Sequence, residues 1–189
     1  MYTRIMSKYI GRFIALFFVS AILLGIYKQI TTPKISVKAT RIVCQTKTTT
    51  FEKVYLQDKV SQVQKLLVSG KFIISSKVWK SKYAKSKLFS YISSKEIDLL
   101  TLDTIKLMTK SNHIKDNRLV IKFYTRENDI KDPGKKTNKS KLYAGYLVYE
   151  FILDKQIVYK IQTDFMNKNG EDIPNRIMCV FKSLLTLQS

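Results

Sequence analysis

The pattern of apolar and polar residues divides the chain into an apolar N-terminal segment and a longer part with mixed periodicity. Residues 13–27 carry no charge and are bounded by Arg12 and Lys28. A bilayer core of about 30 Å needs roughly 20 helical residues, and extending this run to residues 10–30 supplies them. The two flanking charges can reach the interface on their long side chains. We therefore predict a transmembrane helix over residues 10–30, preceded by a basic leader over residues 1–9.

Two other interpretations of the apolar segment stay open. A cleaved signal peptide also has a basic start and an apolar centre, but residues 25–28 lack a small-residue cleavage pattern. A buried core helix is the second alternative, but residues 13–27 are apolar on all faces, which suits lipid better than a half-exposed helix. Basic residues and no acids precede the segment, which favours an N-terminus on the inner side. The folded domain is then expected in the mitochondrial intermembrane space or, alternatively, in a bacterial periplasm.

The basic residues of the leader have a helical spacing. Arg4, Lys8 and Arg12 lie four residues apart and would share one face of a helix. This arrangement is typical of a mitochondrial targeting leader. The sequence does not tell whether such a leader is cleaved. An ordinary positive flank of a bacterial membrane span would look the same. Both origins therefore stay open.

The next part of the chain predicts alternating strands and helices. Residues 31–50 are expected to form a stalk or first strand, because Ile35–Cys44 is rich in β-branched residues. Apolar residues recur at helical spacing over residues 51–68, and alternation over residues 71–80 predicts a strand. A further helix is expected to begin at the capping-box pair Ser93 and Glu96.

The C-terminal half predicts an antiparallel meander and a last helix. Strands are expected over residues 119–124, 142–153 and 156–166, with a turn at Asp154 and Lys155. Pro174 suits the first turn of a helix, where its missing N–H costs nothing. The predicted fold class is α+β: an N-terminal transmembrane helix, then one domain over residues 51–189 with an antiparallel sheet packed by helices.

Positive charge dominates the composition, with a formal net charge of +20. No acid lies between Asp58 and Glu96, and such a field attracts anionic lipids, nucleic acid or acidic protein surfaces. For a membrane-tethered domain we expect lipids or acidic protein subunits as partners, and no nucleic acid. Trp79 and Tyr83 lie among these lysines and could stack on a partner, although a solvated loop would have the same composition. The predicted anionic-partner surface comprises Lys77, Lys80, Lys82, Lys85 and Lys87.

Cys44 and Cys179 are the only cysteines in the chain. In an oxidising compartment they could form one disulfide, which would close a long loop and stabilise the domain by roughly 4–5 kcal/mol in the chain-entropy model. They could equally be two unrelated thiols. The spacing alone leaves both alternatives open.

Part of the chain shows a weak resemblance to a known mitochondrial domain family. It is carried by the helix end at residues 63–70, the strand 118–124, the small-residue strand 143–150 and a strand that closes on Asp164 before an Asn-Gly turn. These segments resemble the domain shared by an accessory subunit of the presequence translocase and a cytochrome oxidase assembly factor. The resemblance implies one membrane span, a domain in the intermembrane space, and assembly or docking work without catalysis.

Three features depart from that family: the longer middle over residues 80–115, the expanded loop over residues 127–141 and the final helix. A short inner tail, one span and an outer α+β domain also resemble the nuclear-transport-factor-like inner-membrane component of type IV secretion machines. That second resemblance is topological only. It supplies the alternative of a periplasmic domain in a bacterial secretion machine.

Catalytic chemistry is not visible in the sequence. His113 is the only histidine, and no nucleophile or carboxylate pattern surrounds it. Neither the spacing of a zinc site nor a glycine-rich phosphate loop occurs, so no metal and no cofactor are expected. We predict a non-enzymatic accessory or assembly subunit of a larger membrane complex, with a mitochondrial respiratory or translocase complex favoured. The alternatives are the secretion-machine component and a binding module for anionic lipid or a small ligand.

Overall fold

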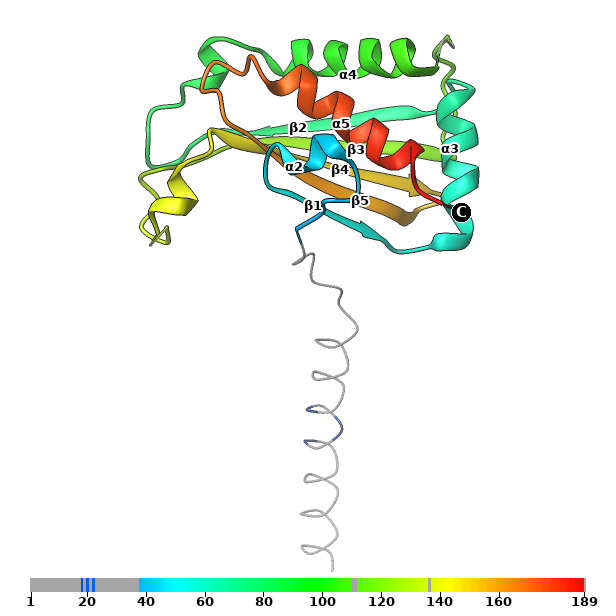
Figure 1. The fold of residues 1–189 in the computed structure, drawn as a ribbon, viewed down its shortest axis with the longest axis horizontal. Coiled ribbons are helices and arrows are strands. Elements are labelled where there is room, and N and C mark those ends of the chain that lie inside the picture. The colour runs from blue at the N-terminus through cyan, green and yellow to red at the C-terminus, as the bar shows by residue number, and fades with distance from the viewer. Residues whose placement is uncertain are drawn as a thin grey trace, which may run out of the picture. The chain divides into compact units, whose positions relative to one another are not determined.

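The computed structural model describes residues 38–109, 112–135 and 137–188, together with Phe18, Ser20 and Ile22 (Figure 1). The chain divides into two compact units, residues 1–35 and residues 36–189. The second unit is the α+β domain described below. The basic leader over residues 1–9, its cleavage and its origin all fall outside the described residues.

The predicted transmembrane fold class requires correction. Within the described ranges, no helix has both the length and the apolar character needed to cross a bilayer. The predicted span over residues 10–30 lies outside the described residues apart from Phe18, Ser20 and Ile22. The helices of the domain are amphipathic, because their apolar residues are buried on one side against the sheet. The single-pass membrane assignment and the localisation that followed from it are therefore not retained.

The domain is built on a five-stranded sheet in the order β1-β5-β4-β3-β2. Its strands are β1 (Thr50–Val54), β2 (Ile73–Trp79), β3 (Leu119–Glu127), β4 (Gly145–Leu153) and β5 (Gln156–Phe165). The meander β3-β4-β5 was correctly predicted from the sequence, because each strand alternates and a two-residue turn joins β4 to β5. Asp154 and Lys155 form the β4–β5 turn with φ of 47° and 67°. Positive φ at both positions matches the right-handed twist of the two strands that a two-residue hairpin joins.

The sheet is mixed, not antiparallel as predicted. β2 pairs parallel with β3, from Ile73 opposite Val120 to Trp79 opposite Arg126. Parallel neighbours need a long crossover connection. Residues 80–118 supply it through α4 (Ser94–Thr109), which begins one residue after the predicted capping residue Ser93. The sequence showed the helix but not that it connects two parallel strands.

Three helices bury their apolar faces against one side of the sheet: α3 (Val60–Val68), α4 and α5 (Ile173–Leu185). The ring of Phe181 in α5 packs edge-on against Tyr149 and Phe151 of β4. The hydroxyl of Tyr149 lies 2.8 Å from that of Thr101 in α4, which satisfies a fully buried polar group. Figure 1 shows α4 and α5 running across the sheet.

The N-terminal part of the domain differs in detail from the predictions. The segment Ile35–Cys44 was expected to be a first strand or a stalk, and its described part contains a bridge between Lys38 and Phe51 and the start of the short helix α2 (Val43–Thr46). The helix predicted over residues 51–68 is strand β1, a single turn η1 (Gln57–Lys59) and then α3. β1 forms because residues far along the chain in β5 offer it hydrogen-bond partners, and no local pattern encodes them.

Candidate functional site

The helices of the described residues leave one face of the sheet without a helical layer, and this face is the candidate site. In β3 the buried residues Leu119, Ile121 and Phe123 face the helices, so Lys122, Tyr124 and Arg126 must face the other way. The strand register extends this second set across the sheet. The open face, as we call it, consists of Ile73, Ser75, Lys77, Trp79, Val120, Lys122, Tyr124, Arg126, Tyr146, Val148, Glu150, Ile152, Lys160, Gln162, Asp164, Phe51 and Lys53.

Aromatic rings and an arginine form one stack across three strands of the open face. The rings of Trp79 and Tyr124 lie 5.7 Å apart with an interplanar angle of 21°. The guanidinium of Arg126 lies 5.2 Å from the Trp79 ring centroid and 5.9 Å from that of Tyr146. Each such cation–π contact is favourable by about 0.5–1 kcal/mol where water has access. The contacts of the stack therefore fix these side chains relative to one another, although Trp79 is still 48% exposed.

The two acids of the open face do not cancel its positive charge. Glu150 is already engaged by Lys160 at 2.6 Å and Lys122 at 3.9 Å. Burial raises the pKa of Asp164 to about 6, against the weaker lowering effect of hydrogen bonds from Gln162 and Thr49. Among the described residues, no carboxylate lies within ion-pair distance of the remaining three cations of this face, which are Lys53, Lys77 and Arg126.

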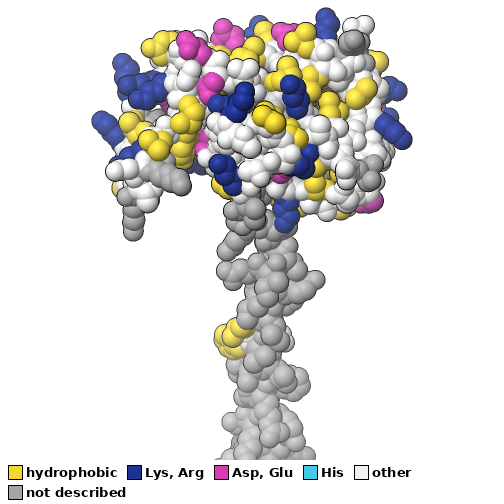
Figure 2. Space-filling view, viewed as in Figure 1, with side chains coloured by type: hydrophobic (Ala, Val, Ile, Leu, Met, Phe, Trp, Pro, Cys, Tyr) yellow, Lys and Arg dark blue, Asp and Glu magenta, His cyan; other side chains and the backbone are white. Residues whose placement is uncertain are grey.

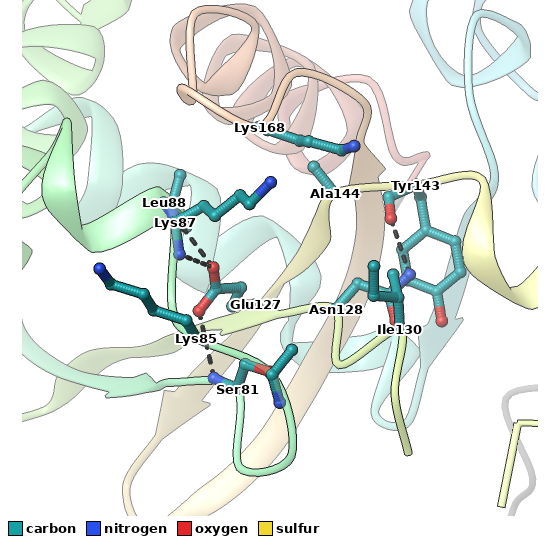
Figure 3. A pocket seen from close by; sticks show the side chains of 11 residues that line it. Ser81, Lys85, Lys87, Leu88, Glu127, Asn128, Ile130, Tyr143, Ala144 and Lys168 are labelled. Carbon is teal, nitrogen blue, oxygen red and sulfur yellow. Dashed lines mark hydrogen bonds between the residues drawn. The ribbon is translucent and has the colours of Figure 1, made fainter. Parts of the chain in front are cut away.

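The lysine-rich loop after β2 is held by two carboxylates. Glu127 accepts hydrogen bonds from the backbone N–H groups of Lys87 at 2.6 Å, Leu88 at 3.0 Å and Ser81 at 3.1 Å (Figure 3). Asp129 accepts two more, from Lys82 and Tyr83, both at 2.6 Å. Burial works to raise the pKa of Glu127, but the N–H donors outweigh it and hold that pKa below its usual range.

The five predicted surface lysines do not form one patch. Lys77 lies on the open face of β2, whereas Lys80, Lys82, Lys85 and Lys87 belong to the carboxylate-held loop. Lys85 and Lys87 line a small cavity with Glu127, which is on the helix side of β3 by register. Sequence reasoning missed Tyr124, Arg126 and Tyr146, although the alternation of Lys122, Tyr124 and Arg126 was a usable signal.

The cavity shown in Figure 3 is lined by Leu88, Ala144 and Ile130 as well as by lysines. Its volume of about 60 Å³ is far below the roughly 300–1,000 Å³ that is usual for a bound cofactor or drug-sized ligand. Lysine and arginine side chains also occur across the molecular face seen in Figure 2. Charge alone therefore does not distinguish the open face. Its distinguishing feature is the combination of partly exposed aromatic rings with cations that have no carboxylate within ion-pair distance among the described residues.

His113, the only histidine of the chain, contacts Phe72. Nε2 of His113 lies 2.8 Å from the carbonyl oxygen of Phe72, and the two rings are in contact, with centroids 4.5 Å apart. Within the described ranges, no group of three or more histidine, cysteine, aspartate or glutamate residues could hold a metal ion.

Cys44 and Cys179 are joined in a disulfide, with their Cα atoms 5.7 Å apart. It links α2 to α5, and polar contacts reinforce the junction. Arg41 donates to the backbone carbonyl oxygen of Ser183 at 2.5 Å and forms an ion pair with Glu52 at 3.1 Å. The segment before β1 is thereby held against the domain.

Comparisons with known proteins give little further information. No protein-family model matches the chain, and no curated protein matches it. Two solved structures of a PelC dodecamer from Paraburkholderia phytofirmans, one of them a point variant, are similar in part. They share 10% and 11% identity, cover 74% of this chain and 99% of their own, and give TM-scores of 0.41 and 0.40. Such values carry no argument about function, and the resemblance to the mitochondrial assembly family stays a prediction.

Proposed function

We propose that this domain is a non-enzymatic docking module, an accessory or assembly subunit of a larger complex, and that it binds its partner through the open face. The observation that carries the proposal is the stack of Trp79, Tyr124, Arg126 and Tyr146 on a sheet face that none of the described helices covers. Tryptophan, tyrosine and arginine are the residues most enriched at the energetic centres of protein interfaces.

The charge of the surface specifies the kind of partner. Lys53, Lys77 and Arg126 have no carboxylate within ion-pair distance in the described part of the chain. An acidic protein surface would pair with them, and the match of opposite potentials would raise the rate of encounter and exclude basic competitors. The partner is therefore an acidic subunit, and the aromatic stack supplies the apolar centre of the contact.

Charge reversal on matched surfaces tests this proposal. One variant carries Lys53→Glu, Lys77→Glu and Arg126→Glu on the open face. Its control carries Lys95→Glu, Lys106→Glu and Lys182→Glu on exposed positions of α4 and α5, so both variants change the net charge equally. Each full-length chain is expressed in its native host, and its apparent mass is followed by native electrophoresis.

The proposal expects the wild type and the control to migrate in a complex larger than the free chain. The open-face variant should migrate as the free chain while keeping its helical and strand content by circular dichroism. Wild-type migration only as a free chain would overturn the proposal. Equal loss of the complex in both variants would show that overall charge, and not the open face, is responsible.

A further inference from the structure

The two edges of the sheet differ in whether a further segment of the described chain pairs with them. Outside β1, the segment at residues 38–39 adds a bridge between Lys38 and Phe51, and the N–H of Ala39 donates to the carbonyl oxygen of Thr50 at 2.6 Å. β2 forms the opposite edge, and the described part of the chain places no strand beyond it. An edge strand of this kind presents a row of N–H and C=O groups to any further strand.

β2 lacks most of the devices that discourage strand addition. It is seven residues long, contains no proline and pairs with β3 without a register shift. Its only charged residue is Lys77. On the helix side its residues Ile74 and Val78 are only half buried, and on the open face Trp79 is 48% exposed. The edge therefore offers both backbone partners and apolar contacts on each side.

The charges near this edge specify its occupant. Lys77, Lys80, Lys82 and Arg126 lie on or beside β2, so an incoming strand meets a positive field. A second copy of this chain suits it poorly, because each copy carries a formal net charge of +20. Two-fold pairing about Ser76 would also bring two Lys77 side chains to one interface. An acidic segment from a different protein is complementary.

We infer that an extended acidic segment of the partner protein pairs with the outer edge of β2 and continues the sheet. Alternate side chains of that segment would lie on opposite faces. Its carboxylates would face Lys77 and Arg126 on the open face, and its apolar residues would meet Ile74 and Val78 on the helix side. This inference rests on the proposed docking function and names the backbone edge through which docking occurs.

Hydrogen exchange on the complex provides the test, with the full-length chain alone as reference. No strand of the described residues pairs with the outward-facing amides of β2, and strand addition would give them partners. We expect exchange within residues 73–79 to slow by about 10-fold or more on complex formation. Exchange in α4, on the helix side, serves as the internal control.

A proline substitution tests the edge independently. Ser75 and Ser76 are adjacent, so the N–H of one points outward and that of the other points toward β3. Proline at the outward position removes only an N–H at the free edge and leaves the hydrogen bonds with β3 intact. The variant that carries proline at this position can therefore be recognised by an unchanged melting temperature. Of Ser75→Pro and Ser76→Pro, the variant that keeps the wild-type melting temperature should no longer join the complex. The alanine variant at the same position should join it.

The outcomes separate this inference from the proposed function. A complex that depends on the open face but leaves exchange in β2 unchanged would overturn strand addition and keep the docking surface. Absence of any complex would overturn both. Protection of β2 in the purified chain at high concentration, with a doubled mass by ultracentrifugation, would show that a second copy is the occupant and would overturn the acidic segment.

Discussion

The guanidinium of Arg126 lies 5.2 Å from the centroid of the Trp79 ring, and through this contact the end of β2 is tied to β3. Trp79 is the only tryptophan in the chain. Its fluorescence therefore reports on the open face without interference from elsewhere in the protein. The same contact makes Arg126 both a structural and a docking residue.

Replacing Arg126 with alanine should change this signal. Loss of the cation above the indole should shift the emission maximum of Trp79 and lower the free energy of unfolding by about 0.5–1 kcal/mol. The control is Arg118→Ala, whose exposed ion pair with Asp116 lies at the opposite end of β3. An unchanged emission spectrum in the Arg126 variant would contradict the stacked geometry.

The disulfide between Cys44 and Cys179 should contribute a large part of the stability. It closes a loop with a sequence separation of 135 residues, and the entropy model assigns such a loop about 4–5 kcal/mol. We expect the double variant Cys44→Ser, Cys179→Ser to lose about 2–5 kcal/mol of unfolding free energy in urea titration. Adding a reductant should lower the wild type to the same value and leave the variant unchanged. A wild type insensitive to reductant would show that the bond is absent.

Glu127→Gln should release the lysine-rich loop. The amide oxygen of glutamine still accepts hydrogen bonds, but it lacks the charge that strengthens the bonds from Lys87, Leu88 and Ser81. We expect a loss of about 1–3 kcal/mol and faster exchange of these three amides by NMR. Glu171→Gln, at an exposed position, is the control and should change neither. Unaltered exchange in the Glu127 variant would contradict the proposed anchoring.

Stability should depend on pH through Asp164. Burial raises its pKa to about 6 in the folded state, compared with about 3.9 in an unfolded chain. The folded state therefore binds the proton more tightly, and stability is lost as pH rises from about 4 to 6. Asp164→Asn should remove this part of the pH dependence in thermal unfolding measured across that window. A variant whose profile still matches the wild type would contradict the burial of this carboxyl.

Glu127 affects the pH dependence of stability in the opposite direction to Asp164, and at lower pH. Its pKa is held below the usual value, so its contribution is fully present above the unfolded-state pKa and is lost as pH falls through the folded-state pKa. The Gln variant should therefore lose less stability on acidification below pH about 4 than the wild type does. This separates the effect of Glu127 from that of Asp164 within one titration.

Local patterns in the sequence were sufficient for the elements whose partners are close in the chain. The β3-β4-β5 meander and the helix that contains Pro174 near its start follow from alternation, a short turn and capping chemistry. Strand β1 was missed because Thr50–Val54 pairs with β5, more than a hundred residues away. The parallel pairing of β2 with β3 was missed because its partner lies beyond the crossover that contains α4, where no local pattern shows the direction of pairing.

The candidate site depends even more on distant pairing. Trp79 and Arg126 are adjacent only because β2 and β3 align in parallel register, and Tyr146 joins them only through the β3–β4 register. The sequence instead emphasised a run of lysines, most of which belong to a loop held by Glu127 and Asp129. A run of charge is visible in a sequence, whereas a surface assembled from three strands requires the register.

Site-specific photocrosslinking tests the central claim most directly. A photoreactive phenylalanine analogue is placed at Lys122 on the open face or at Lys106 on α4 in the full-length chain, expressed in its native host. Illumination should join the chain from position 122 to an acidic protein and produce a discrete product of higher mass, while position 106 gives none. Crosslinks formed from position 106 and absent from position 122 would contradict the assignment of the open face as the docking surface.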